Sequence, residues 1–592
     1  MIHDDDIKTK VYDFGLFRRM FLYTRPYKHI MFLAVILIIV AAFLQLIGPY
    51  LTKLAIDQYI RVGDYDGLTL IVLLYLGVLL VTFVIQYAQS YITQYLGQKL
   101  MYDLRSQIFD HLQKLSLSFF DKNPVGRLMT RVTSDVQALN EMFTEGVVSI
   151  FGDLFLLTGI IIVMLSMNLE LALWTFAVIP LLFIITAIFK RKVRGAFRNV
   201  RKWLAQINTY LQENITGMSI VQVFNRQEKN HREFMRINGE HTNAYIKMVF
   251  YYALFYPAIE LISALALGIV IWQGGLLKMS DLVTYGALVA FIQYAQMFFM
   301  PISDLSEKYN ILQGAMAAAE RIFKLLDTPP SIQTISAPLE KPRVQGRIRF
   351  EKVWFAYNDE DYVLRDVSFT IEPGENIAVV GHTGAGKTTL INLIGRQYEI
   401  QKGRIYLDDI DIQSMDLRQL RSSMAIVLQD VFLFSGTILD NVRLSKPEIS
   451  EARVIEACKK VNAHDFIERL PRKYYTVLNE RGASLSMGQR QLLSFARAIV
   501  VDPQILILDE ATSNIDTETE ILIQEALDYM MRDRTSIIIA HRLSTIKHVD
   551  RILVFHKGYL KEMGSHQELM RQQGLYYQLY QLQYKEQDIA VA

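Results

Sequence analysis

The sequence has almost no cysteine, since Cys458 is the single one among 592 residues. This excludes an internal disulfide and a zinc site built from several cysteines, and it is typical of a protein whose soluble part lies in a reducing compartment. Proline and glycine are also sparse, with 14 and 31 residues. Because the charges balance in sign as well, the composition excludes a disordered or collagen-like chain.

The chain also lacks an excess of basic residues. Its 62 lysines and arginines stand against 60 aspartates and glutamates, so the formal net charge is only +2. Binding to a phosphate backbone needs concentrated basic charge, so we expect no nucleic acid as a partner. Apolar side chains are abundant, at 51% of all residues, and the mean hydropathy is +0.19. Lipid is therefore expected as part of the environment.

Six long apolar segments in the first 325 residues predict membrane-spanning helices. Each is long enough to cross a hydrocarbon core of roughly 30 Å as a helix of about 20 residues. Buried helices of a large soluble domain are a weak alternative, because soluble helices seldom stay apolar on all faces over this length. The predicted spans run approximately over residues 30–50, 68–85, 147–167, 169–189, 249–272 and 283–300.

The residues before the first span predict a surface helix and no signal peptide. Asp4, Asp5 and Asp6 and roughly thirty mostly polar positions precede the first apolar run. Aromatic and basic residues then alternate in a pattern typical of an amphipathic helix that lies in the membrane surface. The residues of this pattern are Phe14, Phe17, Arg18, Arg19, Phe21, Leu22 and Arg25.

The distribution of basic residues predicts the orientation in the membrane. The stretch 190–247 holds twelve lysines and arginines, whereas the short connection 168–170 holds none. Because basic loops stay on the cytosolic side, we expect a multi-pass protein of the cytoplasmic (inner) membrane. Both termini and the two long loops, 86–145 and 190–248, then lie in the cytosol.

Both long loops are too long to be simple connections, and their residue pattern is helical. If each is a pair of helices that continue the spans, arms of about 25 to 30 residues reach some 40 Å into the cytosol. The turns at the two tips are predicted at 119–126 and at 212–217. These tips are natural docking points.

A proline-rich stretch after the sixth span marks the clearest domain boundary, with prolines at 329, 330, 338 and 342. Beyond it, short β-rich runs alternate with helical stretches, as in an α/β domain. We therefore predict a transmembrane domain over 1–327, a linker over 328–346 and an α/β domain over 347–592.

A strand, a glycine-rich loop and a helix follow one another in the α/β domain, where the apolar run 376–380 precedes the loop. In such a P-loop, backbone N–H groups approach phosphate oxygens, Lys387 meets the β and γ phosphates, and Thr388 ligates Mg²⁺. A chance glycine-rich turn is a weak alternative in this strand and helix context. The predicted nucleotide-binding residues of the loop are Gly381, His382, Thr383, Gly384, Ala385, Gly386, Lys387, Thr388 and Thr389.

Two adjacent carboxylates end a second buried strand. Asp509 and Glu510 follow the apolar run 505–508, and a central parallel strand would place them beside the P-loop. Asp509 is suited to hold Mg²⁺, and Glu510 is suited to polarise the attacking water. Alone, this pattern is equally that of an exposed strand end.

His541 and Gln429 also follow strand-like runs, 536–540 and 424–428. The imidazole can contact the γ phosphate and orient the water, and the amide oxygen of Gln429 can reach Mg²⁺ or the water. A structural histidine and a solvated loop residue are the respective alternatives.

A predicted helix start at 485–489 is the last of the candidate nucleotide-site motifs. Taken alone it is a capping box, with Ser486 as N-cap and Gln489 three residues later. In the order P-loop, Gln429, 486–489, Asp509 with Glu510, Asp516 and His541, these residues resemble the ATP-binding cassette family. With six spans ahead of them, the chain is similar to a half-transporter of the exporter type.

This resemblance covers essentially the full length, and it implies a multi-domain protein: a six-helix all-α transmembrane domain and an α/β P-loop nucleotide-binding domain. Its cofactors would be ATP and Mg²⁺, and two cassettes would enclose two ATP molecules. Tyr357 would stack on adenine. Ser486, Gly488 and Gln489 would contact the nucleotide held by the other chain's P-loop. The metal ligands would be Thr388, Gln429 and Asp509, and the catalytic residues Glu510, His541, Lys387 and Gln429.

The chain departs from the family pattern at Met487, where the family has glycine. A glycine permits close backbone approach to the γ phosphate, whereas methionine adds a side chain in the crowded first turn. We therefore favour a heterodimer, in which a partner half-transporter supplies a glycine-bearing helix start to this chain's site. A homodimer that tolerates Met487 is the alternative, because methionine is adaptable.

The predicted cargo is an amphipathic or hydrophobic small molecule, as in multidrug export. Asp153 and Glu260 are ionisable groups within predicted spans, and they would favour cationic amphiphiles. The aromatic residues of the sixth span either line a cavity or simply pack. The alternatives in function are a homodimeric lipid flippase and a nucleotide-gated channel or regulator.

Overall fold

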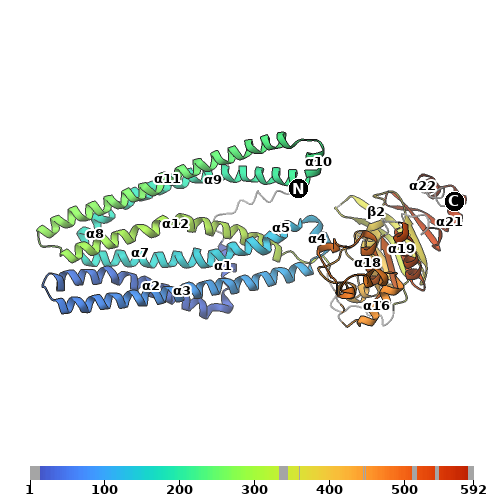
Figure 1. The fold of residues 1–592 in the computed structure, drawn as a ribbon, viewed down its shortest axis with the longest axis horizontal. Helices are drawn as coiled ribbons and strands as arrows, with labels where there is room; N and C mark the ends of the chain where they lie inside the picture. Colours follow the sequence, from blue (N-terminus) through green and yellow to red (C-terminus); the bar gives the residue numbers. More distant parts are fainter. Residues whose placement is uncertain are drawn as a thin grey trace. The chain divides into compact units, whose positions relative to one another are not determined.

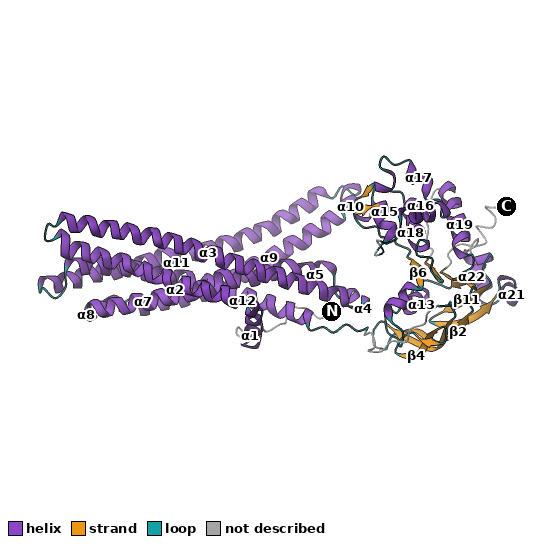
Figure 2. Cartoon of the chain, turned by 90° about the horizontal axis from the view of Figure 1, so that it is seen from below, coloured by secondary structure: helices purple, strands orange, loops and turns teal. Residues whose placement is uncertain are grey.

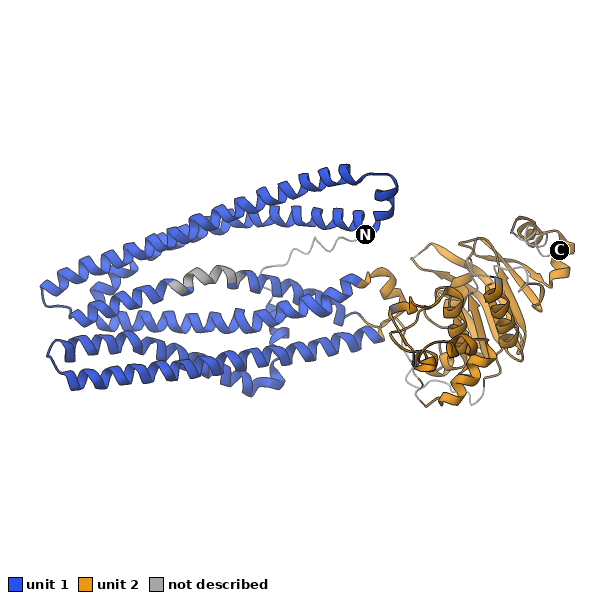
Figure 3. Cartoon of the chain, viewed as in Figure 1, with its two compact units in different colours: residues 1–113, 126–328 blue, residues 114–125, 329–592 orange. Residues whose placement is uncertain are grey.

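The computed structural model describes residues 14–332, 344–358, 360–444, 446, 448–509, 517–539 and 546–583, and of 300, 302–307, 309, 480, 517 and 583 it describes only the backbone. The chain folds into two compact units (Figure 3). The first unit comprises residues 1–113 and 126–328, and the second comprises 114–125 and 329–592. A short segment from the first long loop therefore belongs to the second unit.

The first unit is helical. Its main helices are α1 (Phe14–Leu22), α2 (Lys28–Leu54), α3 (Tyr65–Lys114), α7 (Val148–Met167), α8 (Leu169–Phe176), α9 (Ile179–Thr216), α11 (Gln227–Met279) and α12 (Tyr285–Leu326). Shorter helical pieces connect or extend them: η2 (Arg25–Tyr27), η3 (Ala55–Ile60), α5 (Val125–Thr130), η4 (Arg131–Asp135), α6 (Val136–Glu141), η5 (Met142–Val147) and α10 (Met218–Val223).

The predicted membrane spans correspond to these helices. Five helical stretches of the described chain are long and apolar enough to cross a membrane, and the sixth predicted span corresponds to the shorter apolar stretch Tyr285–Phe299. Many large apolar side chains on them are exposed; Phe32, Leu80 and Phe183 are each 67% exposed. Contact between water and so much apolar surface is unfavourable, so lipid or further helices must cover it.

The two long loops are helix pairs, as predicted. α9 and α11 run side by side and are joined through α10 (Figure 1). The second turn lies a few residues later than the predicted 212–217, because α9 continues to Thr216 and a short helix follows. In the first loop, the predicted turn at 119–126 contains part of α4 (Leu117–Lys122).

The first unit is held together by polar contacts between distant helices. Asp57 accepts hydrogen bonds from the backbone N–H of Gly286 at 2.8 Å and from the hydroxyl of Thr284 at 2.5 Å, at the start of α12. Further along α12, the Tyr294 hydroxyl donates to the carbonyl of Leu46 at 2.6 Å. These contacts fix α12 against the end of the first span.

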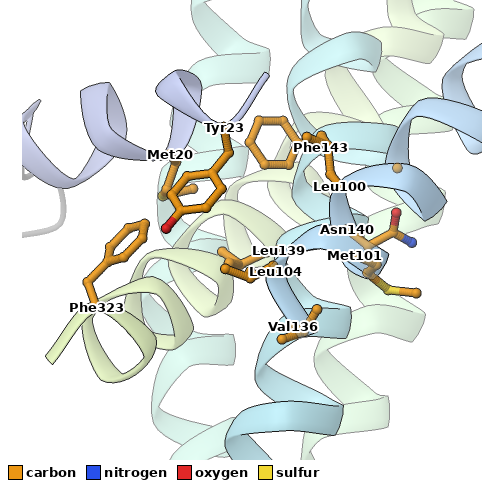
Figure 4. A pocket seen from close by; sticks show the side chains of 11 residues that line it. Met20, Tyr23, Leu100, Met101, Leu104, Val136, Leu139, Asn140, Phe143 and Phe323 are labelled. Carbon is orange, nitrogen blue, oxygen red and sulfur yellow. The ribbon is translucent and has the colours of Figure 1, made fainter. Parts of the chain in front are cut away.

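The predicted amphipathic helix is present as α1. Its Met20 is 1% exposed, whereas Phe14 is 79% exposed. Met20 lines a small apolar pocket together with Phe143 and Phe323 (Figure 4). The Arg19 guanidinium pairs with Asp327 at 2.6 Å, so α1 is tied to the residue that follows α12.

The second unit is an α/β domain built on two main sheets (Figure 2). The antiparallel sheet has the order β2-β1-β4-β5, with β1 (Ile348–Ala356), β2 (Tyr362–Ile371), β4 (Lys402–Leu407) and β5 (Ile410–Asp411). The larger sheet has the order β12-β11-β3-β10-β9-β6, with β3 (Asn376–Val380), β6 (Met424–Val427), β9 (Ile505–Asp509), β10 (Thr535–Ile539), β11 (Arg551–His556) and β12 (Tyr559–Gly564). A small pair, β7 (Gly436–Thr437) and β8 (Val477–Leu478), completes the strands of the described chain.

The second unit also contains helices. They are α13 (Lys387–Ile394), α14 (Leu417–Ser422), α15 (Ile438–Arg443), α16 (Glu451–Lys460), α17 (His464–Glu468), α18 (Met487–Ile499), α19 (Thr517–Met531), α21 (His566–Gln572) and α22 (Leu575–Gln583), with η6 (Lys473–Tyr475) and η7 (Glu480–Gly482) between them. Every residue of β9 and β10 is buried, as expected for central parallel strands. Parallel pairing of β6, β9, β10, β3 and β11 places their carboxyl ends at one edge of the sheet.

Candidate nucleotide site

The P-loop connects the carboxyl end of β3 to α13. Gly381 and Gly386 have φ angles of 154° and 101°. A Cβ at Gly381 would lie 2.3 Å from the carbonyl oxygen of Phe555, so a larger residue cannot take this position without a backbone shift. Because glycine allows this tight path, the loop can wrap around a phosphate group with its N–H groups.

Lys387 opens α13 and is the buried cation of the loop. Its side chain donates to the carbonyl oxygens of Gly381 at 2.8 Å and His382 at 3.2 Å, and the residue is 8% exposed. Burial lowers the pKa of Lys387, and the nearby Asp509 carboxylate opposes that shift. Carbonyl oxygens compensate a buried cation only partly, so a phosphate is a better partner.

The other loop residues surround this position. His382, Thr383, Gly384 and Thr388 are exposed, whereas Ala385 and Thr389 are 4% and 5% exposed. The Thr388 hydroxyl therefore lies on an accessible part of the first turn of α13. This placement suits a metal ligand beside a bound triphosphate.

Asp509 lies at the same sheet edge. It is 8% exposed, ends β9 and pairs in register with Ile539 of β10, which in turn pairs with Val379 of β3. Gln429 follows the end of β6 by two residues and is exposed. Glu510, Asp516 and His541 lie outside the described residues, so their predicted roles stay predictions.

The oxygen donors at this edge fit a magnesium ion. A hydroxyl from Thr388, a carboxylate from Asp509 and an amide oxygen from Gln429 are ligands that Mg²⁺ accepts, usually with phosphate oxygens and water. The described residues contain no group of three or more histidine, cysteine or acidic side chains suited to a metal. The chemistry of these three side chains fits a metal ion that is bound together with a nucleotide.

Tyr357 lies beside the P-loop in an aromatic cluster. Its ring contacts those of Phe355 and Tyr398 edge to face, with centroid distances of 4.8 and 5.1 Å. Its hydroxyl lies 3.1 Å from that of Thr389, and the residue is 37% exposed. A tyrosine held in this way next to the phosphate loop is well placed to stack on a base.

Tyr398 is a residue that the sequence analysis missed. Its hydroxyl donates to the carboxylate of Asp121 in α4, within the second unit. Burial and this carboxylate raise the pKa of Tyr398 above its usual value. Tyr398 stands in no motif, and only the fold brings it between Tyr357 and the segment that follows α3.

The helix start at α18 is the predicted capping box. The Ser486 hydroxyl accepts from the backbone N–H of Gln489 at 3.2 Å, and the Gln489 amide oxygen accepts from that of Ser486 at 3.1 Å. Met487 is the first helical residue and is 49% exposed, whereas Gly488 is buried. Among the described residues, no hydrogen bond joins this helix start to the P-loop of the same chain.

Two acidic residues of the predicted spans have different surroundings. Asp153 in α7 forms an ion pair with Lys308 in α12, and Glu260 in α11 is exposed. The aromatic residues Phe291 and Tyr294 of α12 are fully buried within the unit. Packing therefore accounts for them, in agreement with the simpler of the two interpretations.

Comparisons with known proteins agree with these features. The family model described as "ABC transporter transmembrane region" matches residues 31–302, and the one described as "ABC transporter" matches residues 364–513. An uncharacterized ABC transporter ATP-binding protein of Bacillus subtilis is 38% identical over 98% of this chain and 96% of its own length.

Two further relatives carry functional names. A probable multidrug resistance ABC transporter ATP-binding/permease protein of Bacillus subtilis is 37% identical over 90% of this chain and 79% of its own length. An ATP-dependent lipid A-core flippase of Syntrophus aciditrophicus is 36% identical over 97% of this chain and 95% of its own length. The chain therefore belongs to the ATP-binding cassette transporter family, as a half-transporter of the exporter type whose α/β unit is an ATPase coupled to transport.

Proposed function

We propose that this chain exports amphipathic or hydrophobic small molecules across the cytoplasmic membrane as one half of a heterodimer. In this heterodimer one ATP site is efficient and the other is slow. The nucleotide-binding domain and both termini face the cytosol. The observation that carries the proposal is the methionine at position 487, in the first turn of α18.

The proposal also assigns a role in ATP hydrolysis to each predicted site residue. Lys387 exchanges its carbonyl partners for phosphate oxygens, and its charge offsets charge that develops during hydrolysis. Glu510 polarises the attacking water, and His541 orients it. Thr388, Gln429 and Asp509 would hold Mg²⁺, and the ion would supply positive charge that offsets the charge of the phosphates. Tyr357 orients the base.

The helix start of α18 acts on the nucleotide of the opposite chain. Its orphan N–H groups and the positive end of the helix dipole favour a γ phosphate. The capping box already engages the side chains of Ser486 and Gln489. Close approach therefore depends on the backbone around Gly488, next to which Met487 places an exposed thioether chain. The partner's site, which this helix start completes, would be the slow one.

Export follows from the family mechanism applied to this chain. ATP closes the two cassettes, the tips of the helix pairs move, and the cavity between the spans changes from inward to outward facing. Hydrolysis resets the cycle. Any ligand that favours the outward form must bind it more tightly than the inward form.

A homodimeric lipid flippase is the second candidate, supported by the similarity to a lipid A-core flippase. The two functions differ in what stimulates the ATPase, since lipid headgroups would act in the flippase and amphipathic drugs in the exporter. A nucleotide-gated channel or regulator is the third candidate, and it would move no substrate against a concentration gradient.

The decisive experiment measures ATP-dependent accumulation of a fluorescent amphiphile in inverted membrane vesicles. Vesicles would contain the chain alone, or the chain with each candidate partner half-transporter encoded in the same genome. We expect transport only with a partner, and we expect its loss on Glu510→Gln. Brisk, Glu510-dependent ATPase of a stable dimer of this chain alone would refute the heterodimer.

A further inference from the structure

A basic hollow lies between α9 and α11, the two helices that run side by side in Figure 1. Its volume is about 450 Å³, and its lining includes Lys192 and Arg198 from α9 and Lys247 from α11. No acidic residue of the described chain belongs to this lining. Because three positive charges around one hollow repel one another, an anion in the hollow would be stabilised.

Aromatic packing fixes the two helices beside the hollow. The Phe189 ring of α9 stacks on the Phe255 ring of α11, with a centroid distance of 3.7 Å, and contacts Tyr252 edge to face at 5.2 Å. Ala196 and Met248 are buried in the same helix contact. The cations of the hollow therefore project from a firmly packed helix pair, as in a binding site that is formed before its ligand arrives.

The hollow lies at the depth of the lipid headgroups. Lys192 follows the predicted span 169–189 by three residues, and Lys247 precedes the predicted span 249–272 by two. At 1.5 Å per residue, these separations are about 5 and 3 Å along the helix axes. The polar layer on each side of the hydrocarbon core is roughly 5 to 8 Å thick. Tyr251, which also lines the hollow, is a residue type common at this depth.

Exposed apolar side chains continue from the hollow into both predicted spans. On each helix they recur at spacings of three, four or seven residues from the lysine, and such spacings place side chains on one helix face. On α9 these residues are Leu181, Ile184 and Ile188, and on α11 they are Leu254, Leu261 and Leu265. The face that bears the charges therefore also offers apolar surface for hydrocarbon chains.

We propose that this hollow binds the phosphodiester head of an anionic phospholipid. Lys192, Arg198 and Lys247 contact the phosphate, the Tyr251 hydroxyl donates a hydrogen bond to it, and the acyl chains lie along the apolar faces of α9 and α11. The lipid comes from the cytosolic leaflet in the orientation proposed above. It is a bound component that bridges α9 and α11, and not the exported cargo, so the inference goes beyond the proposed function.

Two related ligands fit the site less well. A soluble phosphate ester has the charge of the lipid head but gains nothing from the apolar faces. A zwitterionic phospholipid has the acyl chains, but its own cation offsets the charge of its phosphate, so the basic residues attract it less.

The test is native mass spectrometry of the purified full-length chain in detergent, without nucleotide, during titration with lipid. The probes are dioleoyl-phosphatidylglycerol and dioleoyl-phosphatidylcholine, with glycerol phosphate as the soluble competitor. We expect the wild type to bind the first phosphatidylglycerol at least about tenfold more tightly than phosphatidylcholine. Lys192→Gln with Lys247→Gln should weaken phosphatidylglycerol binding roughly 25-fold, about fivefold for each lysine, and leave phosphatidylcholine binding unchanged.

The matched control is Arg191→Gln with Arg194→Gln. These exposed residues carry the same charge on the same part of α9, but neither lines the hollow. Their replacement should change phosphatidylglycerol affinity less than about twofold. Gly195→Leu tests the hollow itself, because a Cβ at this lining position would have no atom within 4 Å. Leucine favours the helix, fills the hollow without a change in charge, and should weaken phosphatidylglycerol binding.

Three results would overturn the inference. The first is equal affinity for the two phospholipids, or an equal loss in the two double variants, because the basic residues would then act only as general surface charge. The second is displacement of phosphatidylglycerol by a large excess of glycerol phosphate, which would indicate a site for soluble anions. The third is loss of phosphatidylglycerol binding on assembly with a partner half-transporter, because the partner would then cover the hollow. None of these results bears on export, which the vesicle assay tests separately.

Discussion

Replacing Met487 by glycine is the sharpest perturbation of the proposed slow site. Met487 is the first residue of α18 and is half-exposed, so its removal leaves no cavity in the core. Glycine costs at most about 1 kcal/mol in a helix, and less in the first turn. Displacement of a transition-state contact by about 1 Å costs roughly 100-fold in rate, or about 2.7 kcal/mol.

The small effect of glycine on stability and its large effect on the ATPase rate are therefore separable in one experiment. In a dimer of this chain alone, Met487→Gly should raise the ATPase rate 10- to 100-fold, while thermal stability changes little. In the heterodimer the same change should raise the total rate no more than about twofold, because the efficient site uses the partner's helix start. Met487→Ala is the control for simple loss of the side chain, and Glu510→Gln in the same chain should abolish the gain.

The assay is steady-state release of phosphate by purified protein at saturating Mg-ATP, with melting followed by intrinsic fluorescence. The reasoning is refuted if Met487→Gly leaves the rate of the isolated dimer unchanged while the wild type already turns over briskly. In that case methionine would be tolerated at this position, and the homodimer would be the better interpretation.

Other predictions concern the second unit. Lys387→Ala should lower the ATPase rate at least about 100-fold. The melting assay described above serves as the control that the variant is folded. Tyr398→Phe removes a hydrogen bond to the Asp121 carboxylate, which is worth about 1.5 kcal/mol. Tryptic cleavage at Lys122 should therefore become roughly tenfold faster. An unchanged cleavage rate would show that this hydrogen bond does not restrain α4. Burial raises the pKa of Cys458 to about 12, so maleimide should label it only after unfolding. Because this folded pKa lies above the ordinary value of 9.0, its contribution to stability is complete below pH 9 and should decrease as pH rises towards 12, as urea titrations at several pH values would show.

The strand, loop and helix of the P-loop were predictable because each part has a local cause. β3 is apolar and short, and the glycines at 381 and 386 supply backbone angles that other residues rarely adopt. The capping box at Ser486 was equally visible, since its two hydrogen bonds join residues only three apart. The spans were predictable for a similar reason, because a helix in lipid must be apolar over its whole length.

Contacts between distant segments were not predictable in this way. Nothing near Tyr398 indicates that it lies against Tyr357 and bonds to Asp121, which is 277 residues away. Asp153 was predicted to be a candidate for cation binding, but its partner Lys308 lies on another helix 155 residues away. The sequence shows which groups are ionisable, whereas pairing depends on which helix faces meet.

The sequence by itself determined the class of this protein, because membrane spans, P-loop and helix caps are each specified by a few neighbouring residues through backbone geometry and hydropathy. Only the tertiary structure decided which charges are neutralised and which tyrosine joins α4 to the nucleotide site. Those outcomes depend on long-range packing, where the free energy of one contact depends on every element that positions its two partners.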